Sequence, residues 1–492
     1  MTNLYGLTIK EAAQKLATKE VTSVELTQAF LSRIKELEPK LNSFITVTER
    51  EALEQARLSD ERRAKGQTLS KIDGVPMALK DVFMTRGIKT TAASKILEDF
   101  IPPFDATVTK KLAEAGCVML GKVNTDEFTM GSSTENSYFG PTKNPWDLDR
   151  VPGGSSGGSA AAVSADECVF ALGTDTGGSI RQPSSFCSTV GLKVSYGLVS
   201  RYGVVSYASS FDTIGPITKS VEDAAIVLNH IAGNDPNDGT STQEKLPDYT
   251  TFLREDLQGK KIGVPKEFFG EGLDAEVAGI LDNAKKVLES LGAKVVDVSL
   301  PMTKYAIATY YVLVKSEASS NLSRYDGIRY GHSKLKNQNQ KPKSLEQVYI
   351  DSRTEGFGNE AKRSIMMGTY TLSSGYYDAY YLKAAKVRTK IKQEYERVLS
   401  EVDVLIAPVS PFPAFRIGEK LDDPLSMYKA DADTVPINTA GVPAMSVPAG
   451  FTKSGLPVGM QIIGPMMGEG KIFEVASAFE KAIKLSTNKP NL

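Results

Sequence analysis

The stretch VPGGSSGGSAAAV, residues 151–163, joins two Gly-Gly pairs and two adjacent serines to a run of alanines. Such a density of Gly and Ser is typical of a flexible linker. The neighbouring sequence argues against a linker, because AAAVSA is a good helix segment and CVFALGTDTGGSI contains a candidate buried strand. A phosphate-binding loop is also disfavoured, since no GK[ST] follows the glycines and GGSSGG does not satisfy GxGxxG. The stretch is therefore interpreted as a sharp turn that presents serine hydroxyls at the start of a helix.

A second loop of the same kind, GTDTGGSIRQPS, follows at residues 173–184. Gly177 and Gly178 precede Ser179, and the backbone N–H groups of these three residues can point at one spot. Fixed donors of this kind form an oxyanion hole, where a tetrahedral intermediate carries its negative charge. Two Gly-Gly-Ser loops separated by one helix and one strand indicate a composite site at the end of a sheet.

Outward from these loops, the sequence alternates between short apolar runs and amphipathic helices. GVPMALK and CVMLGKV are predicted strands on either side of DATVTKKLAEAG, and KKIGVP and AKVVDVSL bracket a second predicted helix. Strand–helix–strand units with short joins predict a parallel sheet. We expect one large α/β domain over residues 1–492, with a mixed, mainly parallel twisted sheet covered by helices on both faces. Residues 1–66 are expected to form a helical segment packed on it, and residues 305–400 a helix-rich insertion that contributes to the substrate pocket.

The composition is that of an ordinary globular protein, with 41% hydrophobic and 24% charged residues and a net charge of −1. This charge argues against a dedicated nucleic-acid binder. No apolar run approaches the roughly 18 residues that span a bilayer, and the N-terminus lacks a signal-peptide apolar stretch. A cytoplasmic protein without membrane contact is therefore predicted. The three cysteines are too scattered for a disulfide framework or a zinc site, so no metal is expected.

The catalytic base of such a site is expected to be a lysine rather than a histidine. The chain has only two histidines, His230 and His332, and neither lies near a serine motif in the sequence. Lys80 ends the apolar run GVPMALK, where an ordinary surface lysine is unexpected. Because the reference pKa of lysine is ~10.4, Lys80 can act as a base only if burial lowers that pKa strongly. The structural alternative for Lys80 is a strand-terminal side chain that reaches water.

Three segments together resemble the amidase signature family: Lys80 in GVPMALKDVF, the block PGGSSGGSAAAV, and the block GTDTGGSIRQPSSFCSTVGLKVSYG. That family hydrolyses amides with a Ser–cis-Ser–Lys triad. The resemblance implies that Ser179 is the nucleophile, that Lys80 is the base, and that Ser155 follows a cis peptide bond and bridges the two. It also implies an oxyanion hole built from the backbone N–H groups of Thr176, Gly177, Gly178 and Ser179.

Four further segments narrow the resemblance to one branch of that family, the glutaminase subunits of tRNA-dependent amidotransferases. They are EASSNLSRYDGIRYG, GFGNEAKRSIMMGTY, SSGYYDAYYLKA and NTAGVPAMSVPAGF, and the similarity spans residues 5–485. It implies that Arg363 binds the α-carboxylate of glutamine, that Asp431 binds its α-amino group, and that Tyr310 lines the pocket. Ser364 stands where members of this branch commonly carry a second arginine, and KADADT replaces a more apolar segment around Asp431.

Taken alone, the same three residues also suit structural roles: a solvated helix face for Arg363, a loop cap for Asp431 and the core for Tyr310.

The resemblance implies a heterotrimer in which this chain frees ammonia from glutamine. The ammonia then passes to the B and C subunits, where Glu-tRNA(Gln) becomes Gln-tRNA(Gln), and the tRNA is contacted mainly through the B subunit. No cofactor is expected in this chain, since the sequence has no P-loop and no acidic metal motif. ATP and Mg²⁺ would be used by the partner subunit.

Two alternatives stand beside this interpretation. One is a stand-alone amidase that acts on another small amide, although no amphipathic basic helix of the membrane-binding kind is evident. The other is a non-catalytic scaffold of the same fold, which the presence of all three triad residues disfavours.

Overall fold

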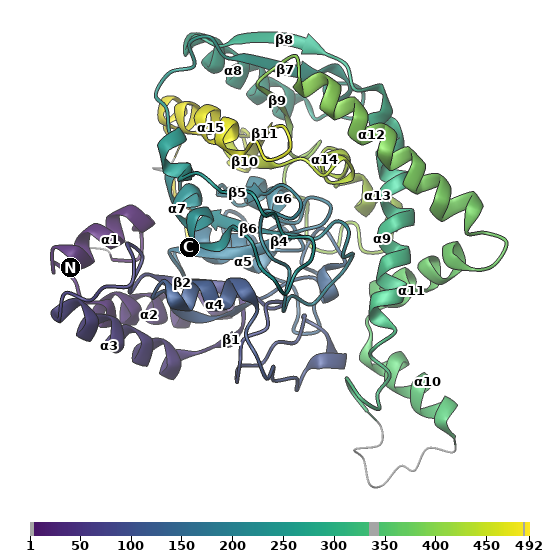
Figure 1. The fold of residues 1–492 in the computed structure, drawn as a ribbon, viewed down its shortest axis with the longest axis horizontal. Helices are drawn as coiled ribbons and strands as arrows, with labels where there is room; N and C mark the ends of the chain where they lie inside the picture. Colours follow the sequence, from purple (N-terminus) through teal and green to yellow (C-terminus); the bar gives the residue numbers. More distant parts are fainter. Residues whose placement is uncertain (1–3, 334–343, 486–487) are drawn as a thin grey trace.

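The computed structural model describes residues 4–333, 344–485 and 488–492. Its centre is one 11-stranded sheet in the order β1-β3-β2-β4-β6-β5-β10-β11-β9-β7-β8 (Figure 1). The strands are β1 Phe44–Val47, β2 Pro76–Lys80, β3 Val118–Val123, β4 Phe170–Asp175, β5 Val190–Lys193, β6 Thr213–Thr218, β7 Lys261–Pro265, β8 Lys294–Val298, β9 Val404–Pro408, β10 Ala444–Phe451 and β11 Pro457–Ile463.

The sheet is mixed, as predicted, and its parallel strands lie in two separate blocks. β3, β2 and β4 pair in parallel near one end, and β9, β7 and β8 pair in parallel at the other. These blocks contain the strand–helix–strand units that the sequence indicated. The other six of the ten strand pairs are antiparallel, a larger share than the sequence suggested. The difference arises because strands such as β10 and β11 join directly as a hairpin, which a search for alternating strands and helices does not detect.

Helices lie on both faces of the sheet. A Cβ on Gly459 of β11 would meet Ser185 of α6, whereas one on Gly450 of β10 would meet Ile280 of α8. Gly450 lies opposite Val458, the residue before Gly459, so α6 and α8 cover opposite faces. Outside residues 1–66 and 305–400 the helices are α4 Thr107–Glu114, α5 Gly157–Ser164, α6 Arg181–Phe186, α7 Val221–Ile231, α8 Ala275–Ser290, α13 Pro424–Lys429, α14 Val435–Ala440 and α15 Glu469–Ile483.

The N-terminal segment is helical except for one strand. α1 Ile9–Ala17, α2 Ser23–Leu41 and α3 Glu49–Ala64 make up the helical part of this segment. Thr22 caps α2 by accepting a hydrogen bond from the N–H of Glu25. The sequence analysis missed β1, which pairs antiparallel with β3, because four residues between two helices are too few to show a strand period.

The described part of residues 305–400 forms a column of helices beside the sheet, on the right in Figure 1. Residues 334–343 of this range lie outside the described structure. α9 and α11 pack closely, since a Cβ on Gly368 would lie 2.0 Å from the carbonyl oxygen of Lys315. The column therefore brings α9 and α11 together, and both helices contribute residues to the lining of one pocket. Its helices are α9 Ala306–Leu322, α10 Leu345–Gly356, α11 Asn359–Leu372 and α12 Lys383–Leu399, with a π-helical turn at Asp378–Leu382.

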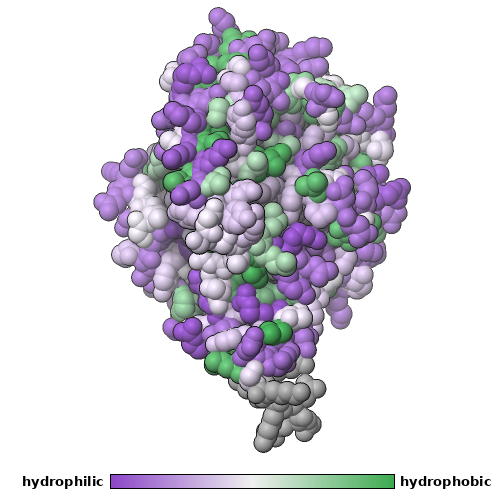
Figure 2. All heavy atoms as spheres, turned by 90° about the vertical axis from the view of Figure 1, so that its right-hand side faces the viewer, coloured by the Kyte–Doolittle hydropathy of each residue, from purple (hydrophilic) through white to green (hydrophobic). Residues whose placement is uncertain are grey.

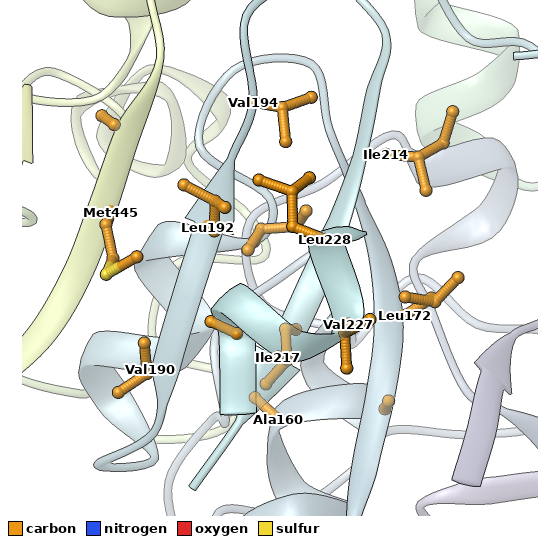
Figure 3. Close-up of a cluster of buried hydrophobic side chains, with 14 of the residues drawn as sticks. Ala160, Leu172, Val190, Leu192, Val194, Ile214, Ile217, Val227, Leu228 and Met445 are labelled. Atoms are coloured by element: carbon orange, nitrogen blue, oxygen red, sulfur yellow. The ribbon is translucent and has the colours of Figure 1, made fainter. Parts of the chain in front are cut away.

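Apolar side chains from both the sheet and the helices fill the core. Figure 3 shows part of it, where Leu192 and Ile217 of the sheet lie beside Leu228 of α7. Charged side chains are buried as well, and a buried charge is costly unless it is paired or neutralised. The largest fully buried side chains include Lys80, Lys122, Arg181 and Lys193.

Hydrophilic residues predominate on the face that carries the helical column, with hydrophobic residues scattered among them (Figure 2). Met366 and Tyr370 of α11 are 73% and 47% exposed. Among the described residues, no helix has the length and apolar character that would let it cross a membrane.

Candidate active site

Lys80 is the last residue of β2, and its side chain is fully buried. Its Nζ donates hydrogen bonds to Ser155 Oγ at 2.8 Å, to Ser156 Oγ at 2.8 Å and to Thr174 Oγ1 at 2.9 Å. The alternative of a lysine that reaches water is therefore wrong. Instead, Lys80 lies among the hydroxyl groups of Ser155 and Ser156 in the first Gly-Ser loop and of Thr174, where β4 leads into the second loop.

The environment of Lys80 favours its neutral amine. Burial lowers the pKa of Lys80 from 10.5 to about 7, although the charges of Asp126, Asp175 and Asp212 oppose the shift. A lysine with this pKa is partly neutral near pH 7 and can accept a proton from a hydroxyl. Lys80 needs a lowered pKa of this kind to act as a base.

Ser155 and Ser156 lie just before α5, and Ser156 connects the two Gly-Ser loops. The peptide bond between Gly154 and Ser155 is cis, as the resemblance implied. Gly154 lies so close to Asp126 that a Cβ on it would be 2.3 Å from the Asp126 carboxylate. The N–H of Ser156 donates to the carbonyl oxygen of Ser179 at 3.1 Å, which joins the first loop to the second. The composite site predicted at the end of the sheet is thus a single structural unit.

The second loop links β4 to α6 and needs both of its glycines. Gly178 has a φ of +132°, and a Cβ on Gly177 would lie 2.4 Å from the hydroxyl oxygen of Tyr310. The N–H of Gly178 donates to Asp175 Oδ1 at 2.8 Å, which corrects the expectation that Gly178 is a donor of the oxyanion hole. Within the described residues, no protein acceptor holds the N–H groups of Gly177 and Ser179.

A buried ion pair holds this loop in place. Arg181 Nε lies 3.1 Å from Asp175 Oδ2, and both side chains are fully buried. Burial by itself would raise the pKa of Asp175, but the charge and hydrogen bonds of Arg181 bring that pKa down to about 2. Thr176 follows Asp175 and donates through its hydroxyl to Asp212 at 2.7 Å. Thr176 is not among the residues that line the pocket, so its place in the oxyanion hole stays a prediction.

A pocket lies in front of Ser179, with about 590 Å³ of empty space when its open mouth is included. Ser179 is 8% exposed, whereas Lys80 and Ser155 are fully buried. The structure thus gathers predicted residues that are far apart in the sequence, while their chemical roles remain predictions. Those that line the pocket are Gly177, Ser179, Tyr310, Arg363 and Asp431.

Asp431 places a carboxyl group in the pocket wall. Its Oδ2 accepts hydrogen bonds from Ser132 Oγ at 2.7 Å and from Tyr311 Oη at 3.0 Å. Burial raises the pKa of Asp431 to about 7, because these two hydrogen bonds only partly offset the loss of water. A cationic group in the pocket would favour the ionised form of Asp431, so this position suits an ammonium group.

Arg363 of α11 lines the same pocket and pairs with Glu360 on the preceding turn. Glu360 also accepts hydrogen bonds at its Oε1 from Lys315 Nζ at 2.6 Å and from Tyr428 Oη at 3.1 Å. Sequence analysis missed Lys315, although a lysine inside the apolar run ATYYVLVKSEAS is itself a signal. It also missed Glu360 and the aromatic and hydroxyl residues beside Asp431, for which no local pattern exists.

The histidines lie away from this pocket. His230 is in the last turn of α7, and His332 Nδ1 lies 3.6 Å from Glu98; neither lines the pocket. Across the described residues, no group of three or more His, Cys, Asp or Glu side chains could hold a metal ion. The cysteines, Cys117, Cys168 and Cys187, are buried and free.

Comparisons with known proteins agree with this geometry. The family model described as Amidase matches residues 25–473. The A subunit of the glutamyl-tRNA(Gln) amidotransferase of Caldanaerobacter subterraneus subsp. tengcongensis is 57% identical over 481 residues, which cover 98% of this chain and 97% of that protein. The crystal structure of the corresponding A subunit from Thermotoga maritima matches with a TM-score of 0.81 and 47% identity, covering 98% of this chain and 96% of that one. Native peptide amidase from Stenotrophomonas maltophilia matches with a TM-score of 0.81 and 28% identity, covering 98% of each chain. The chain therefore belongs to the amidase family of enzymes.

Proposed function

We propose that this chain is the glutaminase subunit of a glutamyl-tRNA(Gln) amidotransferase. The observation that carries the proposal is the pocket itself, which Ser179, the guanidinium-bearing Arg363 and the carboxyl-bearing Asp431 all line. Free glutamine has an α-carboxylate and an α-ammonium group, so a pocket with one cation and one acid matches both charges. A simple amide would offer neither of these groups an opposite charge.

The residues around the pocket support a two-step acyl transfer. In the first step, Ser179 Oγ attacks the side-chain amide carbon of glutamine, and its proton passes through Ser155 Oγ to the neutral Nζ of Lys80. The N–H groups of Gly177 and Ser179 stabilise the negative charge that develops on the carbonyl oxygen. The proton then returns through Ser155 to the amide nitrogen, which leaves as ammonia. Ser179 retains a γ-glutamyl ester.

In the second step, water attacks the ester carbon and gives its proton through Ser155 to Lys80. The bond to Ser179 Oγ breaks, the serine recovers a proton from Lys80 through Ser155, and glutamate leaves. Each cycle therefore consumes one glutamine and one water and releases one glutamate and one ammonia. A hydrogen-bonded contact between Lys80 and Ser155 supports this proton path.

The rest of the reaction is assigned to partner subunits. Relatives of nearly the same length as this chain are named as A subunits of an amidotransferase, which supports a complex with B and C subunits. The ammonia would pass to the subunit that holds Glu-tRNA(Gln), and the tRNA would be bound mainly by the B subunit. ATP and Mg²⁺ would act on that partner, and this chain would need no cofactor of its own.

The test uses the chain assembled with its B and C subunits. Glutamate release from glutamine is measured, together with Gln-tRNA(Gln) formation from either glutamine or ammonium chloride. Ser179→Ala is expected to abolish both glutamine-dependent reactions and to leave the ammonium-dependent reaction intact, because that reaction bypasses this chain. Glutamine use by Ser179→Ala would remove the serine from the mechanism. If the complex hydrolyses simple amides but forms no Gln-tRNA(Gln) with glutamine, the result would favour a stand-alone amidase.

A further inference from the structure

Lys315 is a buried cation in the pocket wall to which neither the sequence nor the comparisons assign a role. It lies in α9 and its side chain is 2% exposed. Its Nζ donates to Glu360 Oε1 at 2.6 Å and to Ser364 Oγ at 2.7 Å, both on α11. The ammonium group also lies 5.3 Å from the centre of the Tyr428 ring. Lys315 thus connects α9 to the helix that carries Arg363.

Glu360 lies between two cations, and this arrangement determines the charge of the part of the pocket wall around Arg363. Its Oε1 faces Lys315 and its Oε2 faces Arg363. The three side chains together carry a net charge of +1, which attracts an incoming carboxylate. Without Lys315, the pair of Glu360 and Arg363 would be neutral, and the carboxylate of Glu360 would compete with a substrate carboxylate for Arg363.

The protonation of the two side chains is consistent with this ion pair. Burial raises the pKa of Glu360, but the charge and hydrogen bond of Lys315, together with Arg363 and Tyr428, outweigh burial and hold that pKa below its usual range. Burial lowers the pKa of Lys315, and the carboxylate of Glu360 opposes that shift.

Ser364 completes the contact between the two helices, because its small hydroxyl group accepts a hydrogen bond from Lys315. We propose that Lys315 is a positioning residue for glutamine recognition, which holds one oxygen of Glu360 and offsets its charge, so that Arg363 can bind the α-carboxylate as well as Glu360. This inference rests on the proposed glutaminase function.

The first test replaces Lys315 in the assembled complex. Lys315→Met is expected to raise the KM for glutamine about tenfold, with kcat changed less than about twofold, because the lost charge acts on substrate binding. Inhibition by glutamate should weaken in parallel, whereas inhibition by 4-aminobutanamide, which lacks the α-carboxylate, should be unchanged. Lys362→Met is the matched control, since Lys362 is half-buried on the same helix and does not line the pocket, and this variant should behave as the unaltered complex. An unchanged KM for Lys315→Met, or equal weakening of both inhibitors, would overturn the inference.

The second test moves the cation to the other helix. Lys315→Met combined with Ser364→Arg is expected to recover most of the lost affinity for glutamine, because the arginine returns a positive charge to Glu360. Lys315→Gln, which keeps a hydrogen-bond donor without the charge, should remain impaired. Normal affinity in Lys315→Gln, or no recovery in the double variant while ammonium-dependent Gln-tRNA(Gln) formation shows an intact complex, would contradict the inference. Failure of the unaltered complex to hydrolyse glutamine would instead refute the proposed function.

Discussion

The Nζ of Lys80 lies 2.8 Å from the Oγ of Ser155, and both side chains are fully buried behind the pocket that Ser179 lines. Solvent therefore has no direct access to the lysine, and a proton can reach it only through a hydroxyl neighbour. The same burial lowers the pKa of Lys80 to about 7. One structural feature thus both isolates the lysine from water and keeps part of it in the neutral form that can accept a proton.

The pH dependence of turnover should follow Lys80. Below a pKa of about 7 the amine is protonated and cannot accept a proton, and above it the amine is neutral. We therefore expect kcat for glutamine to rise as the pH increases through 7 and then to level off. Lys80→Arg should be inactive, because a guanidinium stays protonated. A flat kcat profile across neutral pH, or an active Lys80→Arg enzyme, would contradict this role.

Both histidines should be dispensable. His230 and His332 do not line the pocket, so neither can reach the amide of a bound substrate. The double variant His230→Gln/His332→Gln is expected to keep kcat/KM within about twofold of the unaltered enzyme. Circular dichroism would verify folding. A folded but inactive double variant would return the search for the base to histidine.

Arg363 should act on affinity more than on turnover. A guanidinium can bind the α-carboxylate through two parallel hydrogen bonds, whereas an ammonium group cannot. Loss of one charge-assisted hydrogen bond costs about 1.5–3 kcal/mol, or roughly 10- to 150-fold in affinity. Arg363→Lys is therefore expected to raise the KM for glutamine strongly while kcat falls much less. Steady-state kinetics would decide, and a loss confined to kcat would count against carboxylate binding.

Removal of the Asp175 charge should destabilise the loop that carries Ser179. Asp175→Asn leaves the buried guanidinium of Arg181 without its counterion, a change that typically costs about 3–5 kcal/mol of unfolding free energy. Urea unfolding would measure this loss. Asp282→Asn is the matched control, since Asp282 pairs with Lys285 at 3.1 Å on the surface and its side chain is 64% exposed. Its effect should stay within about 0.5 kcal/mol, and equal effects of the two variants would refute the structural role of Asp175.

The same ion pair predicts how stability responds to acid. The pKa of Asp175 is about 2 in the folded protein and 3.8 in the reference state. Because the folded value is the lower one, the ionised carboxylate stabilises the fold above pH 3.8, and this contribution disappears as the pH falls through about 2. A shift of this size corresponds to roughly 2 kcal/mol. Asp175→Asn should accordingly unfold with less dependence on pH in this range.

Local sequence patterns predicted the parts of the fold that local physics determines. The strand β2, the helix α8 and the two Gly-Ser loops were all predicted from the sequence. Each of them produces a pattern of apolar or glycine residues within a short stretch of the chain. β1 was missed because it is short and depends on pairing with β3. The antiparallel centre of the sheet was underestimated, since strand order depends on contacts between segments far apart in the chain.

By itself, the sequence determined the family resemblance and the placement of Lys80 at a strand end. Only the tertiary structure decided which groups touch. The N–H of Gly178 is held by Asp175 rather than left for a substrate, and Arg181 of α6 and Asn438 of α14 hold the Asp175 carboxylate. Likewise, the hydrogen bond from Tyr311 to Asp431 joins residues 120 positions apart. Such contacts follow from the relative placement of helices and strands, which side-chain packing determines and which a local residue pattern does not encode.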